Sequence, residues 1–264
     1  MNLYPGPLPA NDPQSGFVPT LDLYPVKTTR PTGAVLICPG GGYANRAAHE
    51  GKNIAEALNA HGLHAFVVQY RVAPNRHPAP LADVSRALRI LRARAGEWRI
   101  SPDHIAVCGF SAGGHLAASL GVHFASDIPG AGDAIDRQSN RPDALILCYP
   151  VISAGEFRHP GSFKNLLGEQ ASDKRIEAMS LEKQVTDQTS PAFLWHTAED
   201  ASVPAENSMV FAQALSRRKI PYEMHIFPNG RHGLGLAPEL PNVAAWLGLC
   251  VTWLKNRGWS DGAL

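Results

Sequence analysis

Short apolar runs alternate with helix-length segments along most of this chain, and this alternation constrains the fold more than any other feature of the sequence. Six runs have the composition of buried strands: Ala34–Cys38, Ala65–Tyr70, Ile105–Cys108, Ala144–Tyr149, Ala192–His196 and Tyr222–Phe227. Continuous apolar strands separated by helices are typical of a mostly parallel, doubly wound sheet with helices on both faces. Ligands of such sheets bind at the carboxyl ends of the strands, so we expect functional residues in the loops that follow these runs.

The segments between the runs have helical patterns. In Leu81–Ala95, apolar residues recur at helical spacing with arginines between them: Val84, Leu88 and Leu91. Further helices are expected near Glu50–Ala60, Glu206–Arg217 and Val243–Asn256. The length of 264 residues suits one large α/β domain that spans residues 1–264.

Two segments depart from the alternation. Residues 1–20 are rich in Pro, Asn, Asp and Gly, and we expect them to run extended over the surface. Residues 151–190 mix polar and apolar residues without a clear period. They form either a partial cap over the site or a solvated connection, and the sequence leaves both readings open.

Charge and composition narrow the classes of partner. The formal net charge is +1, which gives no reason to expect nucleic acid or a membrane surface. Residues 1–7 lack the basic and apolar regions of a secretory signal, so we expect a cytoplasmic protein. The four cysteines lack close spacing and are expected to be reduced, buried thiols. The last predicted helix suits the core and a dimer interface equally, which leaves a homo-oligomer open.

A G-x-S-x-G pattern at Gly109–Gly113 lies between an apolar run and a helix-like run of small residues, Gly114–Leu120. A strand that turns tightly into a helix holds the central serine in a strained conformation, which requires small neighbours. The side chain of Ser111 is then exposed above the sheet, and the N-terminus of the helix directs its partial positive charge at the reaction centre. This context predicts Ser111 as a nucleophile.

An activated serine needs a base that accepts its proton and an acid that orients the base. Asp200 and His232 follow the last two predicted strands, in the chain order that this topology requires. Glu199 is the alternative acid. Histidines inside strand-like runs, His196 and His225, are better explained by packing, and so is His115 in the helix after Ser111.

Three glycines follow the first predicted strand, in Cys38–Tyr43. Backbone N–H groups that approach a substrate without an intervening Cβ can stabilise an oxyanion, and Gly40, Gly41 and Ala112 are the candidate donors. A phosphate-binding loop is disfavoured because no Gly-Lys-Ser or Gly-Lys-Thr follows. Tyr43 and Phe110 are candidate substrate-binding residues beside this loop; with Tyr149 and Phe157 they form either an aromatic acyl pocket or core.

Several motifs together resemble those of esterase/lipase-type α/β-hydrolases, over a stretch from about residue 30 to the C-terminus. The matching segments are Pro39–Tyr43, Tyr70–Pro74, Gly109–Gly114, Trp195–Pro204 and His232–Leu236. Proline replaces the histidine that many relatives have before the glycines, which is similar to the bacterial acetyl-xylan-esterase and feruloyl-esterase-like branch. The resemblance implies an α/β-hydrolase fold with nucleophile Ser111, acid Asp200 and base His232.

These inferences predict a serine carboxylesterase that works through an acyl-enzyme, without a cofactor or a metal ion. The resemblance further implies short acyl substrates, acetyl esters of carbohydrates such as acetylated xylo-oligosaccharides; the expected partner is therefore a small-molecule or oligosaccharide ester. Feruloyl ester hydrolysis is the first alternative. A non-catalytic binding protein on a hydrolase scaffold is the second.

Overall fold

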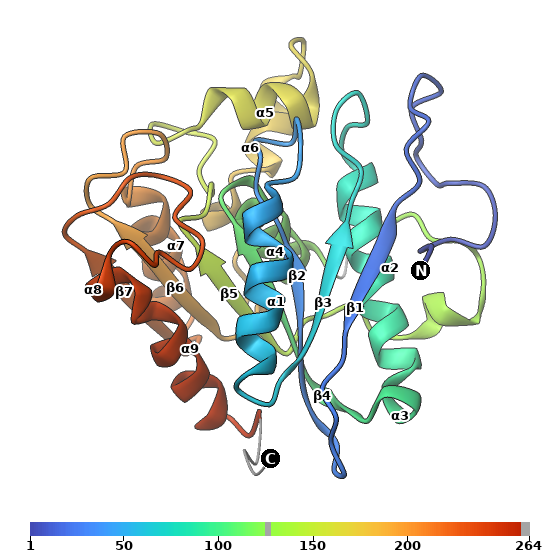
Figure 1. The fold of residues 1–264 in the computed structure, drawn as a ribbon. Helices are drawn as coiled ribbons and strands as arrows, with labels where there is room; N and C mark the ends of the chain where they lie inside the picture. Colours follow the sequence, from blue (N-terminus) through green and yellow to red (C-terminus); the bar gives the residue numbers. More distant parts are fainter. Residues whose placement is uncertain (125–127, 260–264) are drawn as a thin grey trace.

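The structure is a computed structural model that describes residues 1–124 and 128–259. Within these residues, one seven-stranded sheet has the order β1-β3-β2-β4-β5-β6-β7. The first strand runs antiparallel to its neighbour β3, and the other neighbours are parallel (Figure 1). The strands are β1 Thr20–Tyr24, β2 Thr32–Cys38, β3 His64–Gln69, β4 Ile100–Phe110, β5 Ala144–Cys148, β6 Ala192–Thr197 and β7 Tyr222–Phe227.

Helices cover both faces of the sheet, because its central strands are apolar on both sides. The helices are α1 Lys52–Asn59, α2 Ala79–Ala93, α3 Ala95–Trp98, α4 Ala112–His123, α5 Pro160–Leu167, α6 Asp173–Ala178, α7 Glu206–Arg217, α8 Pro241–Ala244 and α9 Trp246–Lys255. One apolar core includes residues of α2, α4 and α7, and a second includes residues of α1 and α9. The predicted fold class is therefore confirmed.

The N-terminal segment differs from the expectation at its start, whereas residues 5–18 are exposed or half-buried. Leu3 and Tyr4 are buried in the core, and the backbone of Met1 exchanges hydrogen bonds with Leu21. Leu21 belongs to β1, the edge strand that the sequence analysis missed. Its five residues are only partly apolar, so the pairing with β3 defines this strand more than its own composition does.

Residues 151–190 contain α5 and α6, and α5 lies above the carboxyl ends of the central strands (Figure 1). Apolar residues of this segment, such as Phe163 and Leu166, pack in the core, and polar contacts join it to neighbouring elements. Asn165 Nδ2 donates to the Gly42 carbonyl at 2.8 Å, and His115 Nε2 donates to the Met179 carbonyl at 3.0 Å. No helix among the described residues is long and apolar enough to span a bilayer.

Candidate active site

The turn between β4 and α4 holds Ser111 in a backbone conformation that is unusual for a residue with a side chain, with φ 53° and ψ −119°. The glycines on either side make this turn sterically accessible. A Cβ on Gly109 would collide with the backbone of Gly113 and Gly114, and a Cβ on Gly113 would collide with the carbonyls of Cys38 and Pro39. The Ser111 side chain lies at the surface of this turn, where the residue keeps 8% of its exposure.

Three predicted residues form one hydrogen-bonded chain. Ser111 Oγ lies 2.7 Å from His232 Nε2, and His232 Nδ1 lies 2.5 Å from Asp200 Oδ2. The loops after β6 and β7 supply Asp200 and His232, so all three side chains meet at the carboxyl edge of the sheet. Because the ionised carboxylate only accepts hydrogen bonds, His232 carries its proton on Nδ1 and presents Nε2 as the acceptor for the Ser111 hydroxyl.

The surroundings of Asp200 favour its ionised form. Burial raises the pKa of this carboxyl, but hydrogen bonds with His196, His232 and the Val203 N–H outweigh burial and hold the pKa well below its usual range. Oδ1 accepts from the N–H groups of Ser202 and Val203, both at 2.9 Å. Asp200 is therefore a fixed anion behind the imidazole.

The alternative acid has a different contact set. Glu199 accepts from Asn229 Nδ2 at 2.8 Å and from the Gly230 N–H at 3.2 Å, so it is bound to the loop that precedes His232. His196 is fully buried; Ser208 Oγ and the Val203 carbonyl are its hydrogen-bond partners, and its Nε2 lies 3.4 Å from Asp200 Oδ2. The structure thus brings Asp200, and not Glu199, to His232.

The glycine loop corrects one predicted donor. The N–H of Gly40 donates to Glu50 Oε2 at 2.7 Å, so this group is directed away from a substrate. The Gly40 carbonyl accepts from Ala47, and the Gly41 carbonyl accepts from Ala44 and Asn45. In a trans peptide the next N–H points opposite to the carbonyl, so these contacts leave the N–H groups of Gly41 and Gly42 turned to the other side.

Candidate oxyanion donors at the site have no protein acceptor among the described residues. They are the N–H groups of Gly41 and Gly42, and that of Ala112 at the start of α4. Gly41 has φ +119° and Gly42 has φ +63°, which explains why this loop consists of glycine. Gly41 and Ala112 were predicted as donors; Gly42 was not, because the sequence does not show which way each peptide faces.

The two predicted substrate-binding residues have different positions. Tyr43 follows the glycines and donates its hydroxyl to His115 Nδ1 at 2.9 Å, beside the site. Phe110 is fully buried and packs against Tyr149 and Trp246 on the other side of the sheet. We therefore assign Phe110 to the core, since side chains alternate across a strand and its ring lies below the site.

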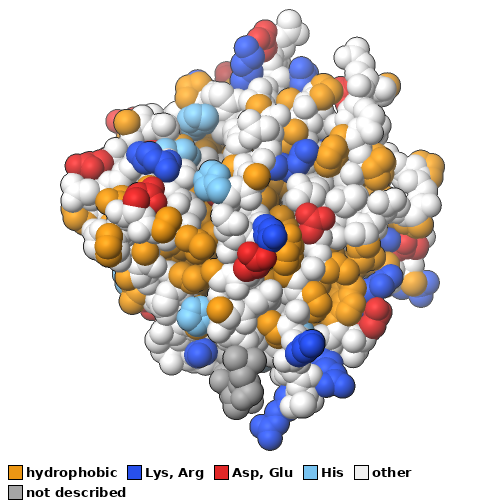
Figure 2. All heavy atoms as spheres, viewed as in Figure 1, with side chains coloured by type: hydrophobic (Ala, Val, Ile, Leu, Met, Phe, Trp, Pro, Cys, Tyr) orange, Lys and Arg blue, Asp and Glu red, His pale blue; other side chains and the backbone are white. Residues whose placement is uncertain are grey.

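The sequence analysis missed Glu50 at the site, and it considered Tyr149 only as part of an aromatic acyl pocket or the core. Glu50 is 2% exposed and accepts from the Tyr149 hydroxyl at 2.6 Å, and Tyr149 packs its ring edge against His232. No signal in the sequence distinguished them: an acid at a helix start is ordinary, and Tyr149 ends an apolar run. Figure 2 shows histidine side chains gathered on the same face, between α5 and the loops before α8.

A doubly wound sheet with a strained serine between its central strand and a helix, and with His and Asp on later loops, defines an α/β hydrolase. Comparison with known proteins agrees. The chain belongs to the BD-FAE family, whose model matches residues 21–215, and this confirms the resemblance inferred from the motifs.

Named relatives are hydrolases that act on esters or xylan. The chain is 41% identical to endo-1,4-beta-xylanase B of Butyrivibrio fibrisolvens over 85% of its length, and 32% identical to an acetylxylan esterase of Xylanibacter ruminicola over 86%. It spans only 36% and 46% of those two proteins.

A solved structure extends the likeness over the whole chain. An acetyl ester-xyloside bifunctional hydrolase from Caldicellulosiruptor lactoaceticus superimposes with a TM-score of 0.94 at 45% identity, covering 98% of this chain and 96% of that one. A carboxylesterase from Lactobacillus plantarum gives a TM-score of 0.78 at 28% identity, with 94% and 95% covered.

Proposed function

We propose that this protein is a serine carboxylesterase that removes short acyl groups, acetyl above all, from carbohydrate alcohols. The observation that carries the proposal is the hydrogen-bonded chain from Ser111 through His232 to Asp200. The neighbouring glycine loop and helix carry the N–H groups of Gly41, Gly42 and Ala112, which have no protein acceptor among the described residues. The names of the acetylxylan esterase and of the acetyl ester-xyloside hydrolase support the choice of ester.

The geometry supports a two-step reaction. His232 Nε2 accepts the Ser111 proton while Oγ bonds to the ester carbonyl carbon, and the carbonyl electron pair moves onto oxygen. The N–H groups of Ala112 and of Gly41 or Gly42 donate to that oxyanion. The ionised Asp200 stabilises the imidazolium, which then protonates the departing alcohol. Water, activated by the same imidazole, hydrolyses the acyl-enzyme and restores Ser111.

The space beside the nucleophile favours a short acyl group. Val151 donates its N–H to the Ser111 carbonyl at 3.0 Å, and Tyr43 follows the glycine loop, so both residues border the serine. They line a narrow crevice with about 120 Å³ of empty space, whose walls are Tyr43, His115, Val151, Ser162, Phe163 and Leu166. This crevice has no room for a hydroxycinnamoyl ring, which favours the shorter acyl group.

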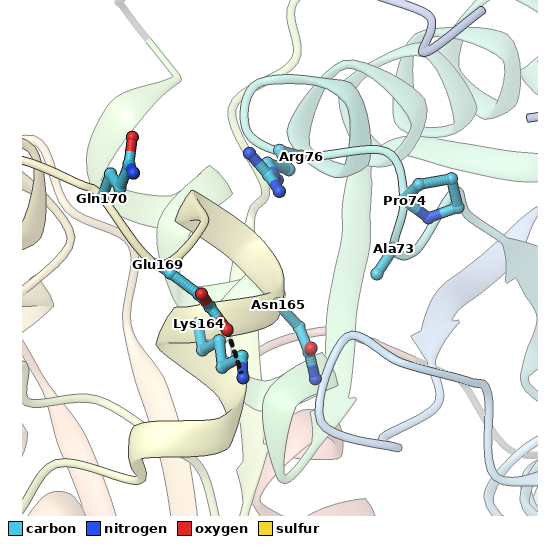
Figure 3. A pocket seen from close by; sticks show the side chains of 7 residues that line it. All are labelled: Ala73, Pro74, Arg76, Lys164, Asn165, Glu169 and Gln170. Carbon is cyan, nitrogen blue, oxygen red and sulfur yellow. Dashed lines mark ion pairs between the residues drawn. The ribbon is translucent and has the colours of Figure 1, made fainter. Parts of the chain in front are cut away.

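A polar groove at the outer rim of the glycine loop favours a hydroxyl-rich alcohol. Figure 3 shows this groove between the loop after β3 and α5; it is lined by Ala73, Pro74, Arg76, Lys164, Asn165, Glu169 and Gln170 and has a volume of about 350 Å³. Hydrogen bonds join two of its lining residues to the glycine loop: Ala73 donates its N–H to the Tyr43 carbonyl, and Asn165 Nδ2 donates to the Gly42 carbonyl. Carbohydrate hydroxyls match these donors and acceptors.

The test is a hydrolysis panel at neutral pH with wild type and Ser111→Ala. It contains 4-nitrophenyl esters of increasing chain length, acetylated xylo-oligosaccharides and methyl ferulate, and also 4-nitrophenyl β-xyloside, because one relative's name includes xyloside hydrolysis. We expect acetate release that Ser111→Ala lowers by 10⁴-fold or more, on the order of what removal of a triad member costs.

Each alternative has its own result. Ferulate release above acetate release would make feruloyl esters the substrate. Failure of the wild type to hydrolyse any ester, together with failure to react with a fluorophosphonate, would favour a binding protein on a hydrolase scaffold. Activity in Ser111→Ala equal to that of the wild type would remove Ser111 from the mechanism.

A further inference from the structure

The reaction proposed above uses Ser111, His232 and Asp200, but it leaves a buried carboxylate at the site unexplained. Glu50 ends the short 3-10 helix Ala48–Glu50, two residues before α1, and is 2% exposed. Burial of a carboxylate is costly unless hydrogen bonds compensate for lost water, and both oxygens of Glu50 have partners. Oε2 accepts from the Gly40 N–H at 2.7 Å, and Oε1 accepts from the Tyr149 hydroxyl at 2.6 Å.

The two partners belong to different parts of the site. Gly40 begins the loop that carries the free N–H groups of Gly41 and Gly42. Tyr149 follows β5, and its hydroxyl also accepts from the N–H of Gly235 at 2.8 Å, three residues after His232. The ring of Tyr149 lies 5.1 Å from that of His232, at 69°. Glu50 therefore connects the glycine loop to the loop of the imidazole.

A second contact from the same short segment reinforces this connection. His49 Nε2 donates to the Gly233 carbonyl at 3.0 Å, one residue after His232. His49 and Glu50 together thus contact the His232 loop on both sides of Leu234, directly and through Tyr149. Since these contacts join residues that are distant in sequence, the relative placement of oxyanion donors and base depends on them.

We infer that Glu50 is a positioning residue: through Gly40 and Tyr149 it aligns the oxyanion donors with the His232 imidazole. This inference rests on the esterase function proposed above. The carboxylate itself carries the wrong charge to stabilise an oxyanion, so its benefit comes from alignment and not from its field. A displacement of about 1 Å in a reacting group can cost 10²-fold in rate, which sets the expected size of the effect.

Glu50→Gln is the first variant, because an amide has one acceptor oxygen where the carboxylate has two. One of the two donors, Gly40 or Tyr149, then faces an NH₂ group. Tyr149→Phe is the second variant; it removes the hydroxyl but keeps the ring against His232. If Glu50 and Tyr149 act through the same chain of hydrogen bonds, the rate of the double variant will lie within threefold of the rate of the slower single variant.

Two matched controls come from the same chain. Glu182→Gln changes a carboxylate oxygen that accepts from Ser153 and Ser180 in the 151–190 segment. Tyr4→Phe removes a buried hydroxyl beside Asp83, outside the chain of contacts made by Glu50 and Tyr149. Both controls should keep kcat within twofold of the wild type.

The experiment measures the rate of Ser111 phosphonylation by a fluorophosphonate, kcat and KM for 4-nitrophenyl acetate, and Tm. Phosphonylation needs the same nucleophile, base and oxyanion donors but no particular ester, so it tests alignment even if the proposed substrate is wrong. We expect Glu50→Gln to lower the phosphonylation rate and kcat by about 10²-fold, with KM within threefold of the wild type. Tyr149→Phe should lower both by about tenfold.

A folded Glu50→Gln variant that is phosphonylated within threefold of the wild-type rate would overturn the inference, and a faster one would show that the field of the carboxylate outweighs alignment. If Glu50→Gln does not fold, a wild-type rate in Tyr149→Phe overturns it equally. A wild type that is phosphonylated but hydrolyses no ester refutes the substrate and leaves the alignment test intact. A wild type that is not phosphonylated refutes both.

Discussion

The turn that holds Ser111 and the 151–190 segment border the same site, but they are held in place by different kinds of contact. At the turn, glycine backbones touch each other directly, Gly109 against Gly113 and Gly113 against the end of β2. The 151–190 segment packs apolar residues such as Phe163 and Leu166 into the core, and polar side chains join it to its neighbours: Asn165 to Gly42, and Asn207 Oδ1 to the N–H groups of Ile152 and Ser153. Backbone sterics fix the nucleophile, whereas side-chain packing and individual hydrogen bonds hold the wall beside it.

This difference implies different responses to substitution. A clash between the backbones of two elements is relieved only when the elements move apart, so one added methyl group displaces the whole turn. A side-chain hydrogen bond contributes about 0.5–1.5 kcal/mol, and its loss leaves the backbone free to stay where it is. We therefore expect large effects at the turn and graded effects in the 151–190 segment.

Gly113→Ala should have the largest effect. Its Cβ would meet the carbonyl oxygens of Cys38 and Pro39, so α4 and the strand end before the glycine loop must separate. We expect kcat/KM for 4-nitrophenyl acetate to fall by about 10²-fold or more, together with a lower Tm. Activity within threefold of the wild type would show that sterics do not fix the turn.

Gly248→Ala is the matched control. Gly248 is the third residue of α9, is exposed, and has nothing within 4 Å of an added Cβ. The same substitution should leave kcat/KM unchanged and stabilise the fold by about 0.5–1 kcal/mol, because alanine favours a helix interior.

The same contrast explains what the sequence could predict. Parallel strands, their helices and the turn at Ser111 follow from local patterns, because apolar runs and small residues impose geometry on their own neighbourhood. The chain order of serine, acid and histidine also indicated His232 and an acid at Asp200, with Glu199 as the alternative; the structure brings Asp200 and His232 together. These features depend little on contacts between residues that are distant in the sequence.

The remaining features depend on contacts between distant residues. Gly40 was predicted as an oxyanion donor, but its N–H is taken by Glu50, and no local pattern shows which way a glycine peptide faces. Phe110 was predicted at the substrate, but strand register turns it into the core. β1 has little apolar signal of its own and exists through its pairing with β3.

His115 lies where the two regions meet, and it should make stability depend on pH. Burial lowers its pKa from 6.5 to about 4, while its Nδ1 and Nε2 bond to Tyr43 and Met179. Between these two values the unfolded chain binds a proton that the folded chain does not, so stability is lost as the pH falls from 6.5 toward 4.

The variant that isolates this contribution is His115→Gln. Of the free energy of unfolding that the wild type loses between pH 7.5 and pH 5, we expect His115 to account for about 2 kcal/mol. Urea titrations at the two pH values should therefore show that the variant loses about 2 kcal/mol less of its free energy of unfolding than the wild type does. Equal losses in both proteins would mean that other groups, such as His77 with its lowered pKa, account for the pH dependence.

Asn165→Ala should have the smallest effect and tests the 151–190 segment alone. It removes the donor to the Gly42 carbonyl, the polar contact that joins α5 to the glycine loop. Without that contact the Gly42 and Tyr43 peptides gain freedom, so we expect kcat to fall about three- to tenfold, in line with the loss of one hydrogen bond, while Tm changes little. Asn53→Ala, an exposed asparagine in α1, should leave both values unchanged. A loss as large as that of Gly113→Ala would show that this segment fixes the nucleophile as firmly as the turn does.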